Sequence, residues 1–358
     1  MIRKIFAAMV ISLTIQSAQS SEFPFTLHKL TSGIPGPTVL VIGGIQGDEP
    51  GGFNAASLLV TDYRATRGEI WVVPNLNFES IIKRSRGVYG DMNRKFLSLS
   101  SNDPEYEAVT KIKRIITDHQ VDMVFNLHDG SGFFNPVHVD KNENPHRWGQ
   151  SIVIDQKAVR ARAFGNLEQI ANKAIDAVNS SSQSKIARFR LKNTRTREGD
   201  KEMEKTLTYF AINSGKPAMG VEASKSHPTE KRIFNHLRFL EAMFDELRIG
   251  FEREFQLSAR TIGRMLGQDI QLALFENKIL YDFESPRKRI KYVPFKRESK
   301  IEFRTNNPLV AIVNTDKNYK VRFGNRGITT LDPQYFDYDN SLDEIGIVID
   351  GVESLVSN

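Results

Sequence analysis

Short apolar runs alternate with longer amphipathic stretches over the first 250 residues, and this alternation constrains the fold more than any other feature of the chain. Five runs have the length and composition of buried strands: TVLVI (38–42), IWVVPNLN (70–77), VDMVFNLHD (121–129), SIVID (151–155) and AMGVEA (218–223). Three stretches show helical periodicity: 103–120, 158–180 and 227–249. Because Asp103 precedes a proline and two glutamates, we expect it to be the N-cap of the first helix. The alternation predicts an α/β domain.

The pattern changes after Glu252, where short alternating runs are separated by turn residues. The runs are EFQLSA, DIQLALFENKIL, KIEFRT, LVAIVN, YKVRFGN and IGIVID. They predict a smaller all-β domain, sandwich-like or barrel-like. We therefore place domains at 21–250 and 251–358. Six lysines and arginines gather between 287 and 297, and two interpretations are open: the solvated face of an edge strand, or a patch that contacts glycans or phosphates.

Residues 1–20 have the features of a secretory signal peptide. Arg3 and Lys4 supply the positive charge, Ile5 to Ile15 the apolar run, and Ala18-Gln19-Ser20 a cleavage site. The apolar run is shorter than the roughly 18 to 20 residues of a membrane-spanning helix, and an uncleaved anchor is the alternative. The formal net charge is +6, or +4 without Arg3 and Lys4, which is compatible with an anionic polymer as substrate.

The 358 residues include no cysteine, so an exported chain of this sequence depends on its core rather than on disulfides. The same absence excludes thiolate metal ligands and cysteine nucleophiles.

The segment GGIQGDEPGG (43–52) directly follows the strand TVLVI. It lacks the G-x-G-x-x-G and Gly-Lys-Ser/Thr patterns, which argues against a phosphate loop. Its Q-x-x-E spacing can instead direct Gln46 and Glu49, two oxygen donors, toward one point. A catalytic zinc site needs a third protein ligand. His128 is the best candidate because it ends a strand, and sites in open α/β sheets form at the carboxyl ends of strands. The alternative is a packed structural histidine.

Glu222 lies within the apolar strand AMGVEA, where an unpaired carboxylate is costly to bury. Near a metal-bound water such a group is useful, since burial moves its pKa toward neutrality and suits it to general acid–base work. The alternative interpretation is a salt-bridged glutamate at the end of a strand.

Four segments, GGIQGDEPGG, SRGVYGDMNRKF, NLHDG and GVEAS, resemble in their order the zinc carboxypeptidase superfamily. That superfamily has the pattern H-x-x-E, then R, N-R, H and E. The chain is most similar to its peptidoglycan branch, the cell-shape-determining murein DL-carboxypeptidases of helical bacteria. In that branch glutamine replaces the first histidine ligand, as at Gln46. The resemblance covers residues 36 to 250 and implies a mixed sheet flanked by helices, followed by a β domain.

Carried over residue by residue, the resemblance implies a ligand set for one zinc ion: Gln46, Glu49 and His128. Arg86 would polarise the scissile carbonyl and stabilise the oxyanion. Asn93 and Arg94 would bind the terminal carboxylate of the substrate, which arginine can do with two hydrogen bonds. Glu222 would be the general base and acid.

Two departures from the superfamily pattern accompany this match. The amide of Gln46 is a poorer zinc donor than imidazole, so we expect a lower metal affinity. The loop NTRTREGDKEMEK (193–205) has no tyrosine where other carboxypeptidases carry one, and Tyr209 is expected to pack instead. The charged loop is interpreted either as solvated or as a contact for further substrate charges.

The resemblance implies trimming of murein tripeptide to dipeptide, with release of meso-diaminopimelate in the periplasm. The expected partners are peptidoglycan with uncross-linked tripeptide stems, and cell-wall proteins through the β domain. We expect no nucleic-acid partner and no stable membrane insertion after signal cleavage. Two alternatives remain: an N-acyl amino acid deacylase of the succinylglutamate desuccinylase and aspartoacylase type, and a degenerate murein-binding scaffold.

Overall fold

The structure is a computed structural model. It describes residues 23–357 except 181–185, 187, 267, 269, 275–278, 284–286, 298–300, 338–340 and 342–343. The predicted signal peptide, residues 1–20, lies outside the described residues. Within the described part, no helix combines the length and the apolar character needed to span a bilayer.

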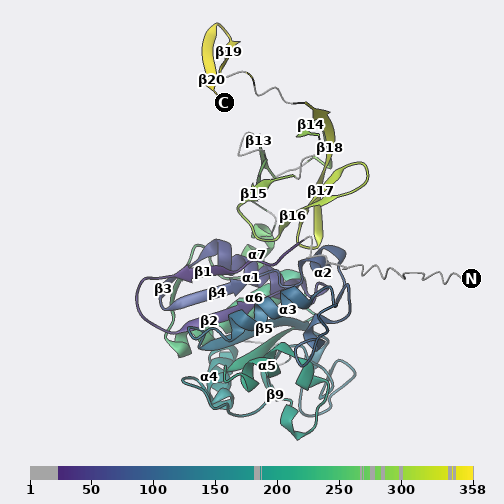
Figure 1. The fold of residues 1–358 in the computed structure, drawn as a ribbon. Coiled ribbons are helices and arrows are strands. Elements are labelled where there is room, and N and C mark those ends of the chain that lie inside the picture. Colours follow the sequence, from purple (N-terminus) through teal and green to yellow (C-terminus); the bar gives the residue numbers. More distant parts are fainter. Residues whose placement is uncertain are drawn as a thin grey trace, which may run out of the picture.

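A seven-stranded mixed sheet forms the centre of the larger part of the molecule (Figure 1). Its strands, in spatial order, are β1 (His28–Thr31), β4 (Glu69–Val73), β2 (Thr38–Ile42), β5 (Met123–Gly130), β10 (Ala218–Ser224), β8 (Ser151–Ile154) and β9 (Arg190–Asn193). The four central strands β4, β2, β5 and β10 run parallel to one another. Strand β1 is antiparallel to β4, and β8 is antiparallel to β10. The predicted mixed sheet is confirmed.

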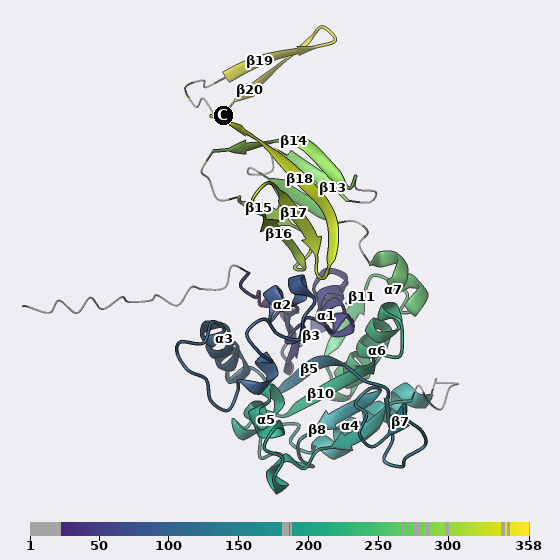
Figure 2. The same ribbon diagram turned by 90° about the vertical axis from the view of Figure 1, so that its right-hand side faces the viewer.

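Helices cover both faces of this sheet (Figure 2). They are α1 (Pro50–Asp62), α2 (Phe78–Lys83), α3 (Tyr106–Ile116), α4 (Leu167–Ser180), α5 (Leu207–Asn213) and α6 (Thr229–Leu247). On one face α6 packs against both α1 and α4, and on the other α3 lies beside α5. Every residue of β5 is buried between these layers, which explains the unbroken apolar character of the central strands.

Two helix starts differ from the sequence-based predictions. The N-cap position of α3 is Glu105, which makes no side-chain cap bond, rather than Asp103. The Asp103 carboxylate does accept from the Glu105 amide (2.8 Å), a capping type of contact just before the helix, and from Lys95 Nζ (2.8 Å). Helix α4 begins at Leu167 rather than near 158, since residues before it form a turn closed by the Val159 amide and the Gly165 carbonyl (2.8 Å).

Beyond residue 250 the chain remains in contact with the α/β part of the molecule. Strand β11 (Gly250–Arg253) pairs antiparallel with β3 (Tyr63–Arg67), and α7 (Ala259–Met265) packs against α6. The run EFQLSA was predicted to be a strand, which is wrong: Ser258 caps α7 by accepting from the Thr261 amide (3.1 Å). The domain boundary near 250 stays a prediction.

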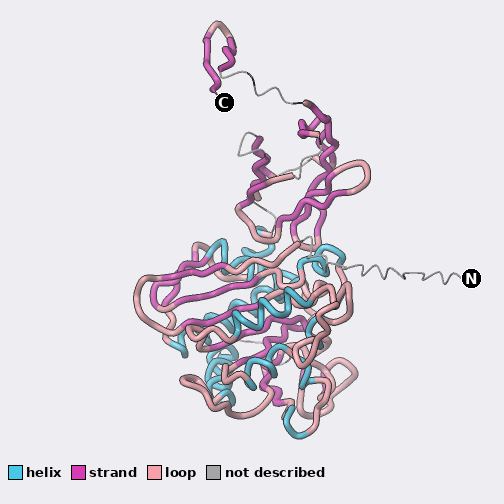
Figure 3. Tube along the Cα trace, in the orientation of Figure 1, coloured by secondary structure: helices cyan, strands magenta, loops and turns pink. Residues whose placement is uncertain are grey.

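The remaining strands form the β-rich part, drawn above the sheet in Figure 3. A three-stranded sheet has the order β13 (Ile279–Asp282), β12 (Gln271–Leu274), β15 (Phe303–Thr305). A four-stranded sheet has the order β14 (Arg289–Lys296), β18 (Arg326–Phe336), β17 (Tyr319–Phe323), β16 (Val310–Asn314). A hairpin, β19 (Glu344–Ile349) and β20 (Val352–Ser357), follows. Most of the lysine and arginine cluster between 287 and 297 lies on or beside β14, which is an edge strand. This position agrees with the interpretation of the cluster as the solvated face of an edge strand.

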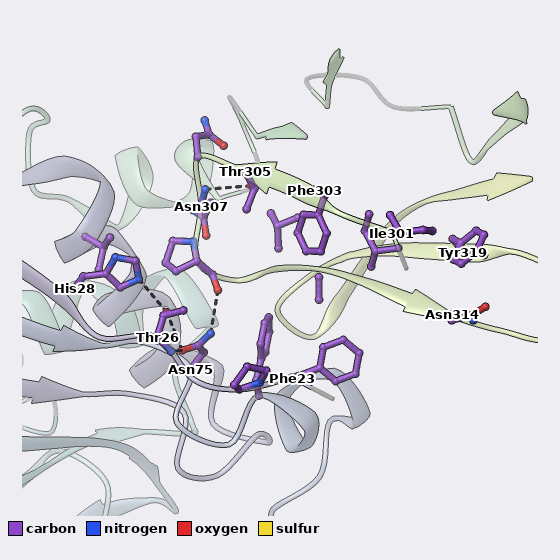
Figure 4. Close-up of a pocket in the computed structure, with 18 residues that line it drawn as sticks. Phe23, Thr26, His28, Asn75, Ile301, Phe303, Thr305, Asn307, Asn314 and Tyr319 are labelled. Carbon is purple, nitrogen blue, oxygen red and sulfur yellow. Dashed lines mark hydrogen bonds between the residues drawn. The ribbon is translucent and has the colours of Figure 1, made fainter. Parts of the chain in front are cut away.

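The two parts share a hydrophobic cluster. Phe53 of α1 and Phe78 of α2 are buried together with Val310 and Phe323 from the β-rich part. Beside this cluster lies a cavity of about 710 Å³ that both parts line (Figure 4). Its wall includes Phe78 and the aromatic residues Phe23, Phe303 and Tyr319. Burial of these rings couples the β-rich part to the α/β part.

A close backbone approach beside Gln46 yields the first prediction. A Cβ atom added at Gly47 would lie 2.0 Å from the carbonyl carbon of Ser80 and 2.1 Å from its oxygen, so the backbone of α2 would have to move. We expect Gly47→Ala to lower the free energy of unfolding by about 2 to 3 kcal/mol, measured by urea denaturation.

Gly327→Ala is the matched control, because a Cβ there meets no atom within 4 Å. It should change stability by no more than about 0.5 kcal/mol. If the two variants had the same urea-denaturation midpoint, the close approach of Gly47 to Ser80 would not contribute to the stability of the fold.

Candidate functional site

A pocket of about 340 Å³ opens where β2, β5 and β10 end. Its lining includes all seven residues that the sequence singled out: Gln46, Glu49, Arg86, Asn93, Arg94, His128 and Glu222. They come from the β2–α1 loop, the segment after α2, the short helix η1 (Met92–Arg94), β5 and β10. The parallel order of these strands brings their carboxyl ends to one edge, as expected for an open α/β sheet.

Three buried donor atoms converge at the base of this pocket. His128 Nδ1 lies 3.1 Å from Gln46 Oε1 and 3.0 Å from Glu49 Oε2, and the three residues are 6%, 2% and 4% exposed. Both oxygens are acceptors, whereas the Nδ1 of a neutral imidazole carries at most one hydrogen. Glu49 Oε2 also accepts from the Asp129 amide (3.1 Å). Two acceptor oxygens and an imidazole nitrogen that face one another form a donor set suited to a cation.

The separations also fit a metal ion. Donors about 2.0 to 2.2 Å from a tetrahedral zinc ion lie about 3.3 to 3.6 Å from one another, close to the distances of 3.1 and 3.0 Å from His128 Nδ1 to Gln46 Oε1 and Glu49 Oε2. Across the described residues there is no group of three histidine, cysteine, aspartate or glutamate side chains that could hold a metal. A metal at this position therefore needs the amide oxygen of Gln46 as its third protein ligand.

Asp91 fixes the orientation of that amide and was not singled out in the sequence. Its Oδ1 accepts from Gln46 Nε2 (2.8 Å), which turns Gln46 Oε1 toward His128. The same oxygen accepts from the Asn93 amide (2.9 Å) as the cap of η1, and Oδ2 accepts from Arg86 Nε (3.0 Å). One carboxylate thus positions three pocket residues, a role of the kind that ligand-orienting groups have in metal sites.

Glu222 stands beside the donor cluster on the neighbouring strand. It is in register with His128 in the parallel pair β10–β5, so both side chains point to the same side of the sheet. Burial raises the pKa of Glu222 to about 7; the charge of His128 lowers it and that of Glu49 raises it further. A carboxyl group with this pKa can accept and return a proton near neutral pH.

Asp129, the residue after His128, faces the opposite side of the sheet and binds the strand to two helices. Its Oδ2 accepts from the Gly51 amide (2.8 Å) in α1 and from Arg232 Nη1 (2.7 Å) in α6, and Oδ1 contacts His236 Nε2 (3.2 Å). Burial opposes the charge, but His236, Arg232 and Gly51 together hold the pKa of Asp129 below its ordinary value. This network fixes the backbone from which His128 projects.

The guanidinium groups of the pocket lie at its rim. Arg86 is half exposed, and its Nη1 is 3.6 Å from Glu49 Oε1. Arg94 Nε is 3.6 Å from Glu202 Oε2, on the loop that lacks the superfamily tyrosine. Asn93 Oδ1 accepts from the Leu207 amide (3.0 Å), which joins η1 to the start of α5.

Tyr209 is partly buried against the main core, as predicted. The pocket lining also includes side chains for which the sequence gave no signal: Trp148, Met203, Thr206, Thr208 and Lys225.

Comparison with known proteins gives a consistent result. The family described as "Carboxypeptidase controlling helical cell shape catalytic" matches residues 27–266. The tripeptide-bound crystal structure of the cell shape determinant Csd4 from Helicobacter pylori is 36% identical, with a TM-score of 0.87, over 93% of this chain and 82% of that one.

The mDAP-bound form of Csd4, described as a D,L-carboxypeptidase, is 38% identical with a TM-score of 0.85, over 90% of this chain and 78% of that one. A Gln46His variant of Csd4 is 36% identical with a TM-score of 0.86, over 93% and 82% of the two chains. A search of curated protein sequences returned no match.

The Asp129 network yields the second prediction. Asp129→Asn keeps the shape of the side chain but removes the charge that balances Arg232, whose side chain is only 13% exposed. Breaking a buried ion pair leaves an uncompensated charge, so we expect a loss of about 3 kcal/mol in the free energy of unfolding. Urea denaturation at neutral pH measures it.

Asp176→Asn, on the exposed face of α4, serves as the control and should stay within about 0.5 kcal/mol of the wild type. If Asp129→Asn were as stable as this control, the network would not hold β5 against α1 and α6.

Proposed function

This chain belongs to the family of carboxypeptidases that control helical cell shape, and we propose that it hydrolyses murein tripeptide with the help of one zinc ion. The products are a dipeptide and meso-diaminopimelate. The observation that carries the proposal is the convergence of Gln46, Glu49 and His128 donor atoms beside Glu222 in one pocket. The tripeptide-bound and mDAP-bound forms of Csd4 support the choice of substrate.

Gln46, Glu49 and His128 would hold the zinc ion, with Asp91 keeping the amide oxygen of Gln46 in position. When bound, zinc supplies Lewis-acid polarisation of the scissile carbonyl and lowers the pKa of water at the site. The rest of the chemistry belongs to the side chains around the donors.

Glu222 is the general base. Its carboxylate removes a proton from the attacking water as the water oxygen bonds to the carbonyl carbon, and the carbonyl carries the resulting negative charge. The protonated Glu222 then gives the proton to the amide nitrogen as the carbon–nitrogen bond breaks. A pKa raised to about 7 by burial suits both transfers.

Arginines determine where the peptide lies. Arg86, half exposed at the rim next to Glu49, stabilises the developing oxyanion. Arg94 and Asn93 bind the carboxylate of the departing residue, with the guanidinium supplying paired hydrogen bonds. The requirement for a free terminal carboxylate makes the enzyme an exopeptidase.

The two other functions considered from the sequence are less well supported. A non-catalytic murein scaffold would not need a buried carboxyl group with a near-neutral pKa beside a donor cluster. A deacylase of the succinylglutamate desuccinylase type is disfavoured by the family match, which spans residues 27–266. The murein substrate lies outside the cytoplasm, so we place the protein in the periplasm, with residues 1–20 as its signal peptide.

The third prediction tests the base. We expect Glu222→Gln to reduce conversion of tripeptide to dipeptide by at least about 100-fold, since the amide keeps the shape but cannot accept the proton. Mass spectrometry of muropeptides before and after incubation measures the conversion.

Glu79→Gln, which removes only an exposed pair with Lys83 on α2, is the matched control and should retain full activity. Dipeptide production by Glu222→Gln at the rate of this control would contradict the mechanism.

The fourth prediction concerns the metal. We expect His128→Ala to weaken zinc binding more than about 100-fold, since the loss of a direct ligand should exceed the effect of losing an outer partner. Isothermal titration calorimetry measures it on the purified protein. His119→Ala, at an exposed histidine beside Asp118, is the control. Unchanged zinc affinity in His128→Ala would remove this histidine from the ligand set.

A further inference from the structure

One charged side chain of the pocket has no part in the mechanism above. The lining carries the cationic side chains Arg86, Arg94 and Lys225, and the first two have roles. Lys225 Nζ lies 3.1 Å from Asp48 Oδ2 and 3.4 Å from Glu49 Oε1, and the side chain is 34% exposed. Its ammonium group therefore stands beside the donor cluster and within reach of a ligand in the pocket.

The surrounding contacts fix the position of this ammonium group. Lys225 directly follows β10, the strand that carries Glu222, and its amide donates to the Gly130 carbonyl at the end of β5 (2.7 Å). Its side chain is held by Asp48, two residues before α1 begins. Lys225 is thus anchored to the two central strands and to the α1 side of the sheet.

Arg94 approaches the pocket from the other side. Its helix η1 is joined to the start of α5 through Asn93 and the Leu207 amide, and α5 lies on the sheet face opposite α6 (Figure 2). Helix α1 packs against α6. In the proposed mechanism the terminal carboxylate of the substrate binds Arg94, and its scissile carbonyl lies at the donor cluster. The acyl side of the substrate, beyond the scissile bond, therefore extends toward Lys225.

Murein tripeptide carries a free carboxylate on the acyl side of its scissile bond. The scissile amide is formed by the γ-carboxyl of D-glutamate, so the α-carboxylate of the same residue is free. Ordinary carbon–carbon bond lengths and angles place it about 5 Å from the scissile carbonyl carbon when the side chain is extended. An α-linked peptide has a carboxylate at this distance only where glutamate precedes the scissile bond.

We propose that Lys225 binds this α-carboxylate and thereby selects γ-linked D-glutamyl substrates. The inference rests on the proposed function, and it assigns Lys225 a role in substrate specificity for the same site. Nζ lies next to Glu49 Oε1, while Glu49 Oε2 faces His128 Nδ1, so the ammonium group is separated from the donor cluster by the width of one carboxylate. Lys225 is thus the lining cation that shares a carboxylate with the donor cluster on the α1 side of the pocket.

A purely structural role for Lys225 predicts a different outcome. If the ammonium group served only to balance Asp48 and Glu49, its loss would affect every substrate to the same extent. If it also binds the α-carboxylate, its loss lowers kcat/KM more for substrates that carry this group than for those that lack it. Two peptides that differ at this carboxyl group separate the two roles.

The experiment compares L-Ala-γ-D-Glu-meso-diaminopimelate with the same tripeptide in which the D-glutamate α-carboxyl is a carboxamide. We expect the wild type to prefer the acid by about 10- to 100-fold in kcat/KM, the range for a hydrogen bond between charged groups. Lys225→Met should turn over the acid and the carboxamide with equal kcat/KM. Lys225→Arg should keep the preference, and so should Lys157→Met, which removes a lysine on the surface outside the pocket.

Binding gives a second readout that does not depend on turnover. Calorimetry with Glu222→Gln and with Glu222→Gln/Lys225→Met, both loaded with zinc, should show the same preference for the acid in the first protein and none in the second. Equal losses for both peptides in Lys225→Met, or no preference in the wild type, would overturn the inference. A wild type that binds the acid preferentially but cleaves neither peptide would support the role of Lys225 and contradict the proposed function.

Discussion

The site depends on the burial of three polar side chains at one edge of a parallel sheet. A buried polar atom without a partner is costly, and Gln46, Glu49 and His128 are each less than a tenth exposed. Their donor atoms face one another because β2 and β5 are neighbours and end at the same edge. The proposed metal site is therefore a consequence of strand order together with these three side chains.

Two aspartates stabilise this arrangement from opposite sides. Asp91 accepts from the amide nitrogen of Gln46, so the weaker ligand of the set is held with its oxygen toward the metal position. Asp129 fastens the strand that carries His128 to α1 and α6. In the proposed zinc site, an amide ligand would bind less tightly than imidazole, and the preorganisation of Gln46 by Asp91 would offset part of that loss.

The sequence predicted the features that a local pattern determines, such as buried strands. It missed the residues whose role depends on contacts between distant segments. The buried strands at 38–42 and 218–223 follow from apolar runs, and all seven candidate residues lie in one pocket. Asp103 was expected at the N-cap position of α3, which Glu105 occupies, although the Asp103 carboxylate does accept from the Glu105 amide. Asp91 and Lys225 gave no signal, because the contacts of Asp91 with Gln46 and of Lys225 with Asp48 join segments that only folding brings near.

The most direct test of the account is a crystal structure of the protein grown with zinc and measured at the zinc absorption edge. We expect one anomalous peak about 2.0 to 2.2 Å from Gln46 Oε1, a Glu49 carboxylate oxygen and His128 Nδ1, with Glu222 beside it. A peak elsewhere, or one from which the Gln46 oxygen is turned away toward Asp91, would contradict it.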